Sequence, residues 1–241
     1  MTLLDVIQED GHALVAAAES NWARPVPDCP AWDAAGLVRH TGTVLAWIAT
    51  IVVTGEPASF RSLPLPPAGD ADLPAWFLDN LDRTVGVLGA ADPQQTVWTF
   101  SSLGDHRASW WRRRLAVETA IHRWDAQHAV AVEGGPPPTP LDADVAAAGI
   151  AEFVTEFLPG LLKSCTERPS GKVHLLLTDM APERWLDLDE LGSDDPVQAR
   201  VDATVRGTAS DVLLWLTNRR ADSVDLHGDR DLLEAWTRLK R

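Results

Sequence analysis

Two potential metal ligands stand four residues apart on an otherwise apolar stripe of residues 110–130, which read WWRRRLAVETAIHRWDAQHAV. On a helix, Glu118 and His122 would lie above one another on one face. The other positions along that face are apolar, so the pair falls where the helical period calls for core residues. The full stripe is Trp111, Leu115, Glu118, His122, Ala126 and Ala129.

A carboxylate on a core-facing stripe needs a partner, because an unpaired buried charge is expensive. An ion pair, a shifted pKa or a bound metal would each make it tolerable. The arginines near enough in sequence to form the ion pair are Arg112, Arg113, Arg114 and Arg123. This segment alone therefore leaves both the ion pair and the metal open.

A third ligand-type side chain, His40, is the one polar member of the apolar stripe of an earlier predicted helix. If the two helices are neighbours, His40 would converge with Glu118 and His122. Two imidazoles and one carboxylate leave a position open on zinc, which is typical of catalytic rather than structural zinc. Arg123 or Asp125 could fix the orientation of a ligand, although such residues more commonly form solvated surface pairs.

Helical periodicity supplies the elements that would position these residues. The predicted helices are residues 3–19, 33–54, 74–91 and 108–130. Long amphipathic helices in this order predict an up-and-down bundle, in which metal sites are commonly built from inward-pointing side chains. The strongest break in the chain follows at residues 134–140, GGPPPTP, and marks a linker or boundary.

Beyond this break the pattern changes to short alternating strands mixed with helices. The predicted helices are residues 142–158, 210–218 and 228–240, and the predicted strands are residues 171–180, 184–190, 197–207 and 223–226. The sequence thus predicts a four-helix metal-binding bundle over residues 1–135. A connecting helix and a small α+β domain follow over residues 136–241.

Composition narrows the possible partners and location. The net charge of −14 over 241 residues repels phosphate backbones and argues against a nucleic-acid partner. Two distant cysteines, Cys29 and Cys165, suggest neither a disulfide framework nor a thiolate zinc site. No apolar run approaches membrane-spanning length and the N-terminus lacks the features of a signal peptide, so we expect a soluble, cytoplasmic protein without a membrane partner.

Separated segments of the chain resemble the mycothiol-dependent maleylpyruvate isomerase family. CPAWDAAGLVRHTGTVLAW and, much later, RRLAVETAIHRWDAQ are similar to that family's N-terminal domain, a DinB-like four-helix bundle. GTASDVLLWLTNRR and VDLHGD are similar to its small C-terminal domain, which is related to sterol-carrier-type folds. The resemblance covers most of the chain in the right order.

By position, the resemblance places the family's zinc ligands on His40, Glu118 and His122, the residues that periodicity singles out. The chain departs from the family's usual pattern at two positions. Val117 stands where many relatives have His, and Asn218 stands where a Gly is usual. Neither change removes a ligand, but both leave the substrate open.

The resemblance also implies an arginine of the C-terminal domain that reaches toward the cleft. Arg219 is its best match, with Arg220 and Arg206 as alternatives. The implied enzyme, a monomer or homodimer, uses Zn²⁺ or another divalent metal and mycothiol as cosubstrate. It would isomerise a cis alkene or add the thiol to a small electrophile. The alternatives are a mycothiol S-transferase of detoxification or natural-product biosynthesis, and a non-catalytic small-ligand-binding protein.

Overall fold

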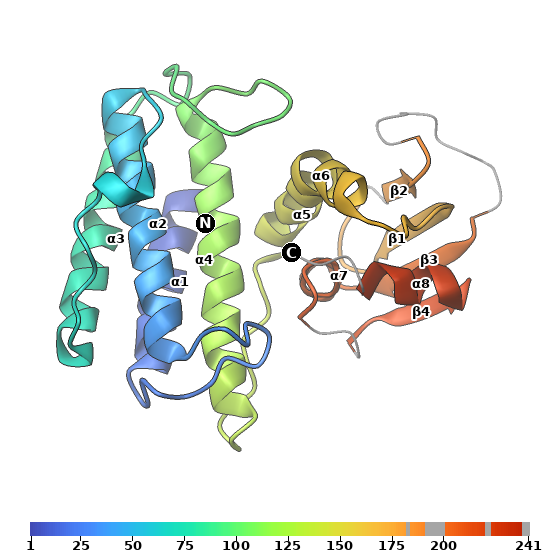
Figure 1. Ribbon diagram of the computed structural model, residues 1–241, viewed down its shortest axis with the longest axis horizontal. Helices are drawn as coiled ribbons and strands as arrows, with labels where there is room; N and C mark the ends of the chain where they lie inside the picture. Colours follow the sequence, from blue (N-terminus) through green and yellow to red (C-terminus); the bar gives the residue numbers. More distant parts are fainter. Residues whose placement is uncertain (182–183, 191–200, 220–222, 238–241) are drawn as a thin grey trace. The chain divides into compact units, whose positions relative to one another are not determined.

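The chain folds as two units, Met1–Leu141 and Asp142–Arg241, each with its own apolar core. The computed structural model describes residues 1–181, 184–190, 201–219 and 223–237. The first unit is helical, and the second combines helices with a small mixed sheet (Figure 1). This arrangement confirms the predicted fold class, a helical bundle followed by a small α+β unit.

Long helices that run side by side build the first unit (Figure 1). They are α1 (Leu3–Ala18), α2 (Ala34–Thr54), α3 (Leu73–Ala90) and α4 (Ala108–Ala131). Their ends follow from local chemistry. Thr2 and Asp5 form a reciprocal capping box at the start of α1. The Asp33 carboxylate caps α2 by accepting a hydrogen bond from the Gly36 N–H. Gly55, with φ of 78°, ends α2 in the left-handed conformation that glycine adopts without strain.

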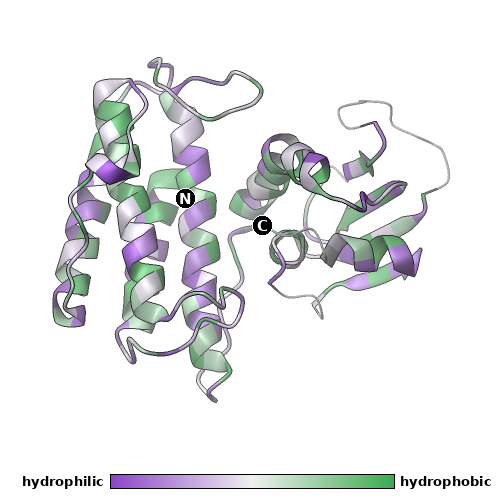
Figure 2. Ribbon diagram, in the orientation of Figure 1, coloured by the Kyte–Doolittle hydropathy of each residue, from purple (hydrophilic) through white to green (hydrophobic). Residues whose placement is uncertain are grey.

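Helix α4 is buried around its whole circumference in its middle, where every residue from 115 to 126 is shielded from solvent. It contacts α1, α2 and α3. Figure 2 shows hydrophilic residues between hydrophobic ones along this helix. A single apolar stripe therefore understates its burial, and its polar groups need partners inside the protein.

Two helical stretches, Ala34–Thr54 and Ala143–Ser164, are long and apolar enough to cross a membrane by length and composition alone. Neither stretch is expected from the sequence pattern, in which no apolar run approaches membrane-spanning length. They are weak evidence for a membrane, because core helices of soluble proteins pass the same test. Helix α2 packs against α3 and α4, and half of its most apolar stretch is buried.

The second unit is built on a four-stranded sheet of order β2-β1-β3-β4. The strands are β1 (Lys172–Leu177), β2 (Arg184–Asp187), β3 (Ala203–Gly207) and β4 (Asp225–Gly228). Strands β1 and β3 are parallel, and the other pairs are antiparallel. Helix α7 (Ala209–Leu216) contacts β1 and β3, and α8 (Arg230–Thr237) contacts β3. Alternate residues of β1 are buried, so one face of the sheet carries the core.

The connecting segment is longer and less regular than the single helix predicted over residues 142–158. It comprises α5 (Ala143–Glu152), a π-helical turn at Phe153–Phe157 and α6 (Leu158–Ser164). Pro159 explains the irregular turn, because a proline has no N–H for the carbonyl four residues earlier and its ring crowds that carbonyl. The last strand lies at Asp225–Gly228 rather than at residues 223–226.

Candidate metal centre

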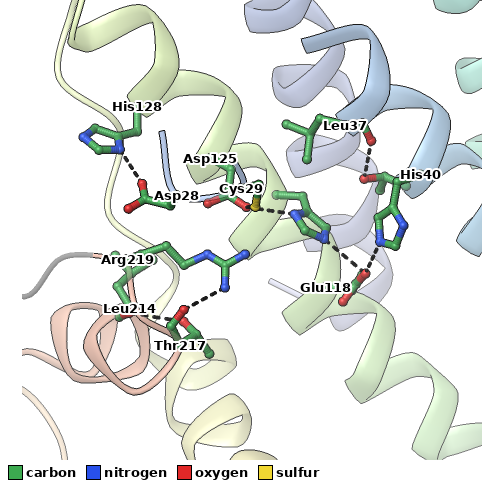
Figure 3. A network of polar contacts seen from close by, with 12 residues as sticks. Asp28, Cys29, Leu37, His40, Glu118, Asp125, His128, Leu214, Thr217 and Arg219 are labelled. Carbon is green, nitrogen blue, oxygen red and sulfur yellow. Dashed lines mark hydrogen bonds and ion pairs between the residues drawn. The ribbon is translucent and has the colours of Figure 1, made fainter. Parts of the chain in front are cut away.

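The structure brings together the three side chains predicted as metal ligands. His40 comes from α2, whereas Glu118 and His122 come from successive turns of α4. One donor atom of each lies within 4.8 Å of the others. Glu118 Oε1 stands 3.3 Å from His40 Nε2 and 3.2 Å from His122 Nε2. Figure 3 shows His40 and Glu118 pointing toward one another across the two helices. No other such group of three His, Cys, Asp or Glu residues occurs in the described part of the chain.

The two oxygens of Glu118 have different partners. Oε1 faces the two imidazoles, while Oε2 accepts a hydrogen bond from Arg114 Nη2. Arg114 is one turn earlier on α4, so both residues share a helix face. The ion pair and the imidazole cluster thus use opposite oxygens. The arginine pairing expected as an alternative to a metal leaves Oε1 directed at the histidines.

The other arginines near this segment serve the scaffold. Arg112 donates hydrogen bonds to the carbonyls of Leu88 and Ala91, at the C-terminal end of α3. Arg113 pairs with Asp105. Arg123 Nε donates to Asp10 Oδ1 on α1 at 3.0 Å, and its guanidinium also binds the carbonyls of Thr139 and Pro140. Arg123 is therefore not the residue that orients a histidine.

Asp125 takes that orienting position. Its Oδ2 lies 2.9 Å from His122 Nδ1, and its side chain is fully buried. When Nδ1–H donates to this carboxylate, the lone pair of a neutral His122 is on Nε2, which faces Glu118. The Cys29 thiol donates to the same Asp125 oxygen at 3.7 Å, and Figure 3 shows Cys29 beside Asp125.

Trp32 covers the two histidines from the loop before α2. Its ring stacks on His40 with centroids 4.4 Å apart, and it meets the His122 ring at an interplanar angle of 60°, with centroids 5.9 Å apart. Trp47 on α2 and Trp111 on α4 instead pack against each other at 5.3 Å in a separate aromatic cluster. Of these three tryptophans, Trp32 is the one positioned to exclude water from the imidazoles.

Charge and burial shift the pKa values of both α4 residues. Burial alone would raise the pKa of Glu118, but the charges of Arg114 and His122, with hydrogen bonds from His122 and His40, hold it well below its usual value. Burial alone would lower the pKa of His122. The Glu118 carboxylate and the hydrogen bond to Asp125 instead raise it to about 9. Without a metal, the cluster is thus a carboxylate facing an imidazolium, and a cation would replace the proton.

Arg219 follows α7 in the second unit, in a tightly defined turn. Asn218 has φ of 57°, the Asn218 N–H donates to Trp215 O, and the Arg219 N–H donates to Leu214 O. These two bonds form a Schellman motif, which requires a left-handed residue at the position of Asn218. Asparagine tolerates this conformation, so the turn does not require a glycine here.

The Arg219 side chain donates from Nη1 to Thr217 O at 2.9 Å (Figure 3). Of the two alternatives, Arg206 pairs with Asp225 on β4 at 3.0 Å, and Arg220 lies outside the described residues. The role of Arg219 toward a substrate therefore stays a prediction.

A helical bundle with a two-histidine, one-carboxylate cluster, joined to a small α+β unit, defines a class of two-domain proteins with a potential metal centre. The family model described as the mycothiol maleylpyruvate isomerase N-terminal domain matches residues 4–127. The model described as the MDMPI C-terminal domain matches residues 144–235. The chain belongs to the mycothiol maleylpyruvate isomerase family, as the resemblance predicted.

One solved structure shares this fold over nearly the whole chain. It is described as the crystal structure of the mycothiol-dependent maleylpyruvate isomerase, with a TM-score of 0.63, 14% identity and coverage of 95% of each chain. At this identity the likeness establishes the common fold. A comparison with curated protein sequences gives no match.

Proposed function

We propose that His40, Glu118 and His122 hold Zn²⁺ or another divalent metal, and that the protein is a mycothiol-dependent enzyme acting on a small electrophile. The observation that carries this proposal is the convergence of these three donors from two helices, in a chain of this family. We infer a soluble, cytoplasmic protein, a monomer or homodimer, without nucleic-acid or membrane partners.

The donor set fits zinc. Neighbouring donors around a tetrahedral zinc with bonds of about 2.0–2.2 Å stand roughly 3.3–3.5 Å apart. Glu118 Oε1 is 3.3 Å and 3.2 Å from the two imidazole nitrogens, so two of the three donor pairs already have about the spacing of ligands that share one ion. Three protein ligands leave a position for an exogenous thiol, as in catalytic rather than structural sites.

A metal bound here would supply positive charge that favours the thiolate form of the cosubstrate near neutral pH. Asp125 would hold His122 with Nε2 toward the centre, and Trp32 would shield both imidazoles from water. Arg219 would pair with a carboxylate of the electrophile, for which the planar guanidinium offers two parallel hydrogen bonds.

In the proposed reaction the thiolate sulfur adds to an activated cis double bond and leaves a single bond about which the product rotates. Elimination then breaks the carbon–sulfur bond, returns the thiol and gives the trans alkene. The same residues would serve an S-transferase if the sequence stopped at addition or displacement, with an S-conjugate as product.

Metal content and turnover together test the proposal. We expect about one zinc per chain, and maleylpyruvate turnover only when mycothiol is added. His122→Ala should lose both, while the matched control His128→Ala should keep both, because His128 pairs with Asp28 instead. Accumulation of an S-conjugate would identify a transferase. If the wild type contains no metal, and His122→Ala retains the fold and thiol binding, both enzyme proposals fail. The non-catalytic small-ligand-binding protein is then the alternative that remains.

A further inference from the structure

The position of Arg114 bears on how Glu118 can bind a metal. Arg114 Nη2 donates to Glu118 Oε2, while Oε1 is directed at His40 and His122. Both members of the ion pair are largely shielded, with side chains 19% and 11% exposed. We propose that Arg114 is a positioning residue that restricts Glu118 to binding the metal through one oxygen, and so keeps a coordination position open. This inference rests on the proposed function.

The argument concerns the number of ligand atoms. A glutamate can bind a metal with one oxygen or with both. With two imidazole nitrogens, one oxygen makes three protein donors and leaves the fourth tetrahedral position for an exogenous ligand. A second oxygen from Glu118 would fill that position, or force a fifth ligand onto the metal when the thiol binds. An enzyme that must admit a thiol therefore gains from keeping Oε2 away from the ion.

Arg114 is well placed to hold Oε2. It lies four residues before Glu118, so the helix itself fixes the approach of the two side chains. A guanidinium binds a carboxylate through directed N–H groups, whereas the ammonium of lysine is a compact point charge. The surroundings are mostly buried, so water and salt screen this pair less than an exposed one.

Cobalt substitution of the full-length protein tests the inference without relying on turnover. Four-coordinate Co²⁺ absorbs visible light several times more strongly than five-coordinate Co²⁺. We expect the Co²⁺-loaded wild type to show the strong four-coordinate spectrum. Arg114→Met frees Oε2 and should lower the peak absorption severalfold. Arg114→Lys, which keeps a cation, should restore part of it.

Arg113→Met is the matched control, because Arg113 is the adjacent arginine of α4 and pairs with Asp105 rather than with Glu118. Its Co²⁺ spectrum should equal that of the wild type. Circular dichroism establishes that each variant is folded. If Arg114→Met does not fold, Arg114→Ala, which also removes every N–H donor to Oε2, decides by the same criterion.

The inference is overturned if Arg114→Met keeps the wild-type spectrum, or if the wild type is itself five-coordinate with both Glu118 oxygens bound. If the wild type binds Co²⁺ and shows thiol-dependent turnover in these cases, the proposed function stands and the inference alone fails. If the wild type takes up neither Co²⁺ nor Zn²⁺, both fail.

Discussion

Replacing Asp125 tests how much the orientation of His122 contributes to zinc binding. It is fully buried and its Oδ2 is 2.9 Å from His122 Nδ1. We predict that Asp125→Ala lowers zinc affinity about 10–100-fold, the usual cost of losing a group that orients a ligand. Competition with a chromophoric chelator measures the change.

Asp28→Ala is the control for Asp125→Ala, because Asp28 makes the analogous bond to His128 on the same helix at 2.7 Å. It should leave zinc affinity unchanged. Equal losses in the two variants would show that the effect comes from general loosening of α4 rather than from the orientation of His122.

The raised pKa of His122 predicts a pH dependence of metal binding. The pKa is about 9 in the metal-free protein, because the Glu118 carboxylate and the bond to Asp125 outweigh burial. Below pH 9 the metal must displace the His122 proton, so apparent affinity should rise about tenfold per pH unit from pH 7 and level off near pH 9. Calorimetry in buffers of different ionisation enthalpy should find about one proton released from His122 per metal at pH 7.5. An affinity independent of pH over this range would contradict the shift.

The sequence predicts the cluster because His40, Glu118 and His122 each break an apolar helical stripe, and helical periodicity is readable without coordinates. It does not distinguish Trp32 from Trp47 and Trp111 as the residue over the imidazoles, because Trp32 precedes α2 and its place depends on the loop. The sequence leaves both Asp125 and Arg123 open as the partner of His122, although helical spacing favours Asp125, because residues three apart share a helix face and adjacent residues do not. Asp10 of α1 and the carbonyls of Thr139 and Pro140 bind Arg123 elsewhere.

Helices α1 and α3 pack closely at Gly11, and this contact should reverse the usual effect of replacing a helical glycine with alanine. An added Cβ at Gly11 would lie 2.6 and 2.8 Å from the two methyl carbons of Leu81, which is fully buried. Alanine normally stabilises a helix interior by about 0.5–1 kcal/mol over glycine, but overpacking a core costs about 1–3 kcal/mol. Gly11→Ala should therefore lower the free energy of unfolding by about 1–2 kcal/mol in urea denaturation.

Gly86→Ala provides the opposite case on α3. Nothing lies within 4 Å of a Cβ at this exposed position. Gly86→Ala should therefore raise the free energy of unfolding by up to about 1 kcal/mol. The two substitutions make the same chemical change in helices of one bundle, and a difference in sign would come from packing. A higher free energy of unfolding in both variants would mean that α1 and α3 can move apart at Gly11 without losing stability.

The elements differ in how well local sequence predicts them. Helix α2 has the predicted bounds because its two ends are fixed by neighbouring residues, Asp33 and Gly55. The π-helical turn at Phe153–Phe157 is not evident from periodicity, since a following proline can end a helix or distort it. The placement of β4 at Asp225–Gly228 depends on its register with β3, a long-range pairing that no local pattern specifies.

At the scale of the whole molecule, the proline-rich segment belongs with the first unit. The sequence pattern predicts a boundary after residue 135, whereas the units divide between Leu141 and Asp142. Arg123 binds residues 136–141 to the first unit. Its side chain is only 4% exposed, and its guanidinium donates hydrogen bonds to the carbonyls of Thr139 and Pro140. Composition identifies the proline-rich segment as a break in the helical pattern. It does not reveal that Arg123 on α4 binds this segment.

The proposed function divides its chemistry between the two units, and Arg219 tests that division. If the metal residues are in the first unit and Arg219 pairs with a substrate carboxylate, Arg219→Ala should keep wild-type zinc content. Loss of a hydrogen bond to a charged group costs about 1.5–3 kcal/mol, so kcat/KM should fall about 10–150-fold. Arg206→Ala is the control, because Arg206 pairs with exposed Asp225. Equal activity losses in both variants, or zinc loss in Arg219→Ala, would assign Arg219 to the scaffold instead.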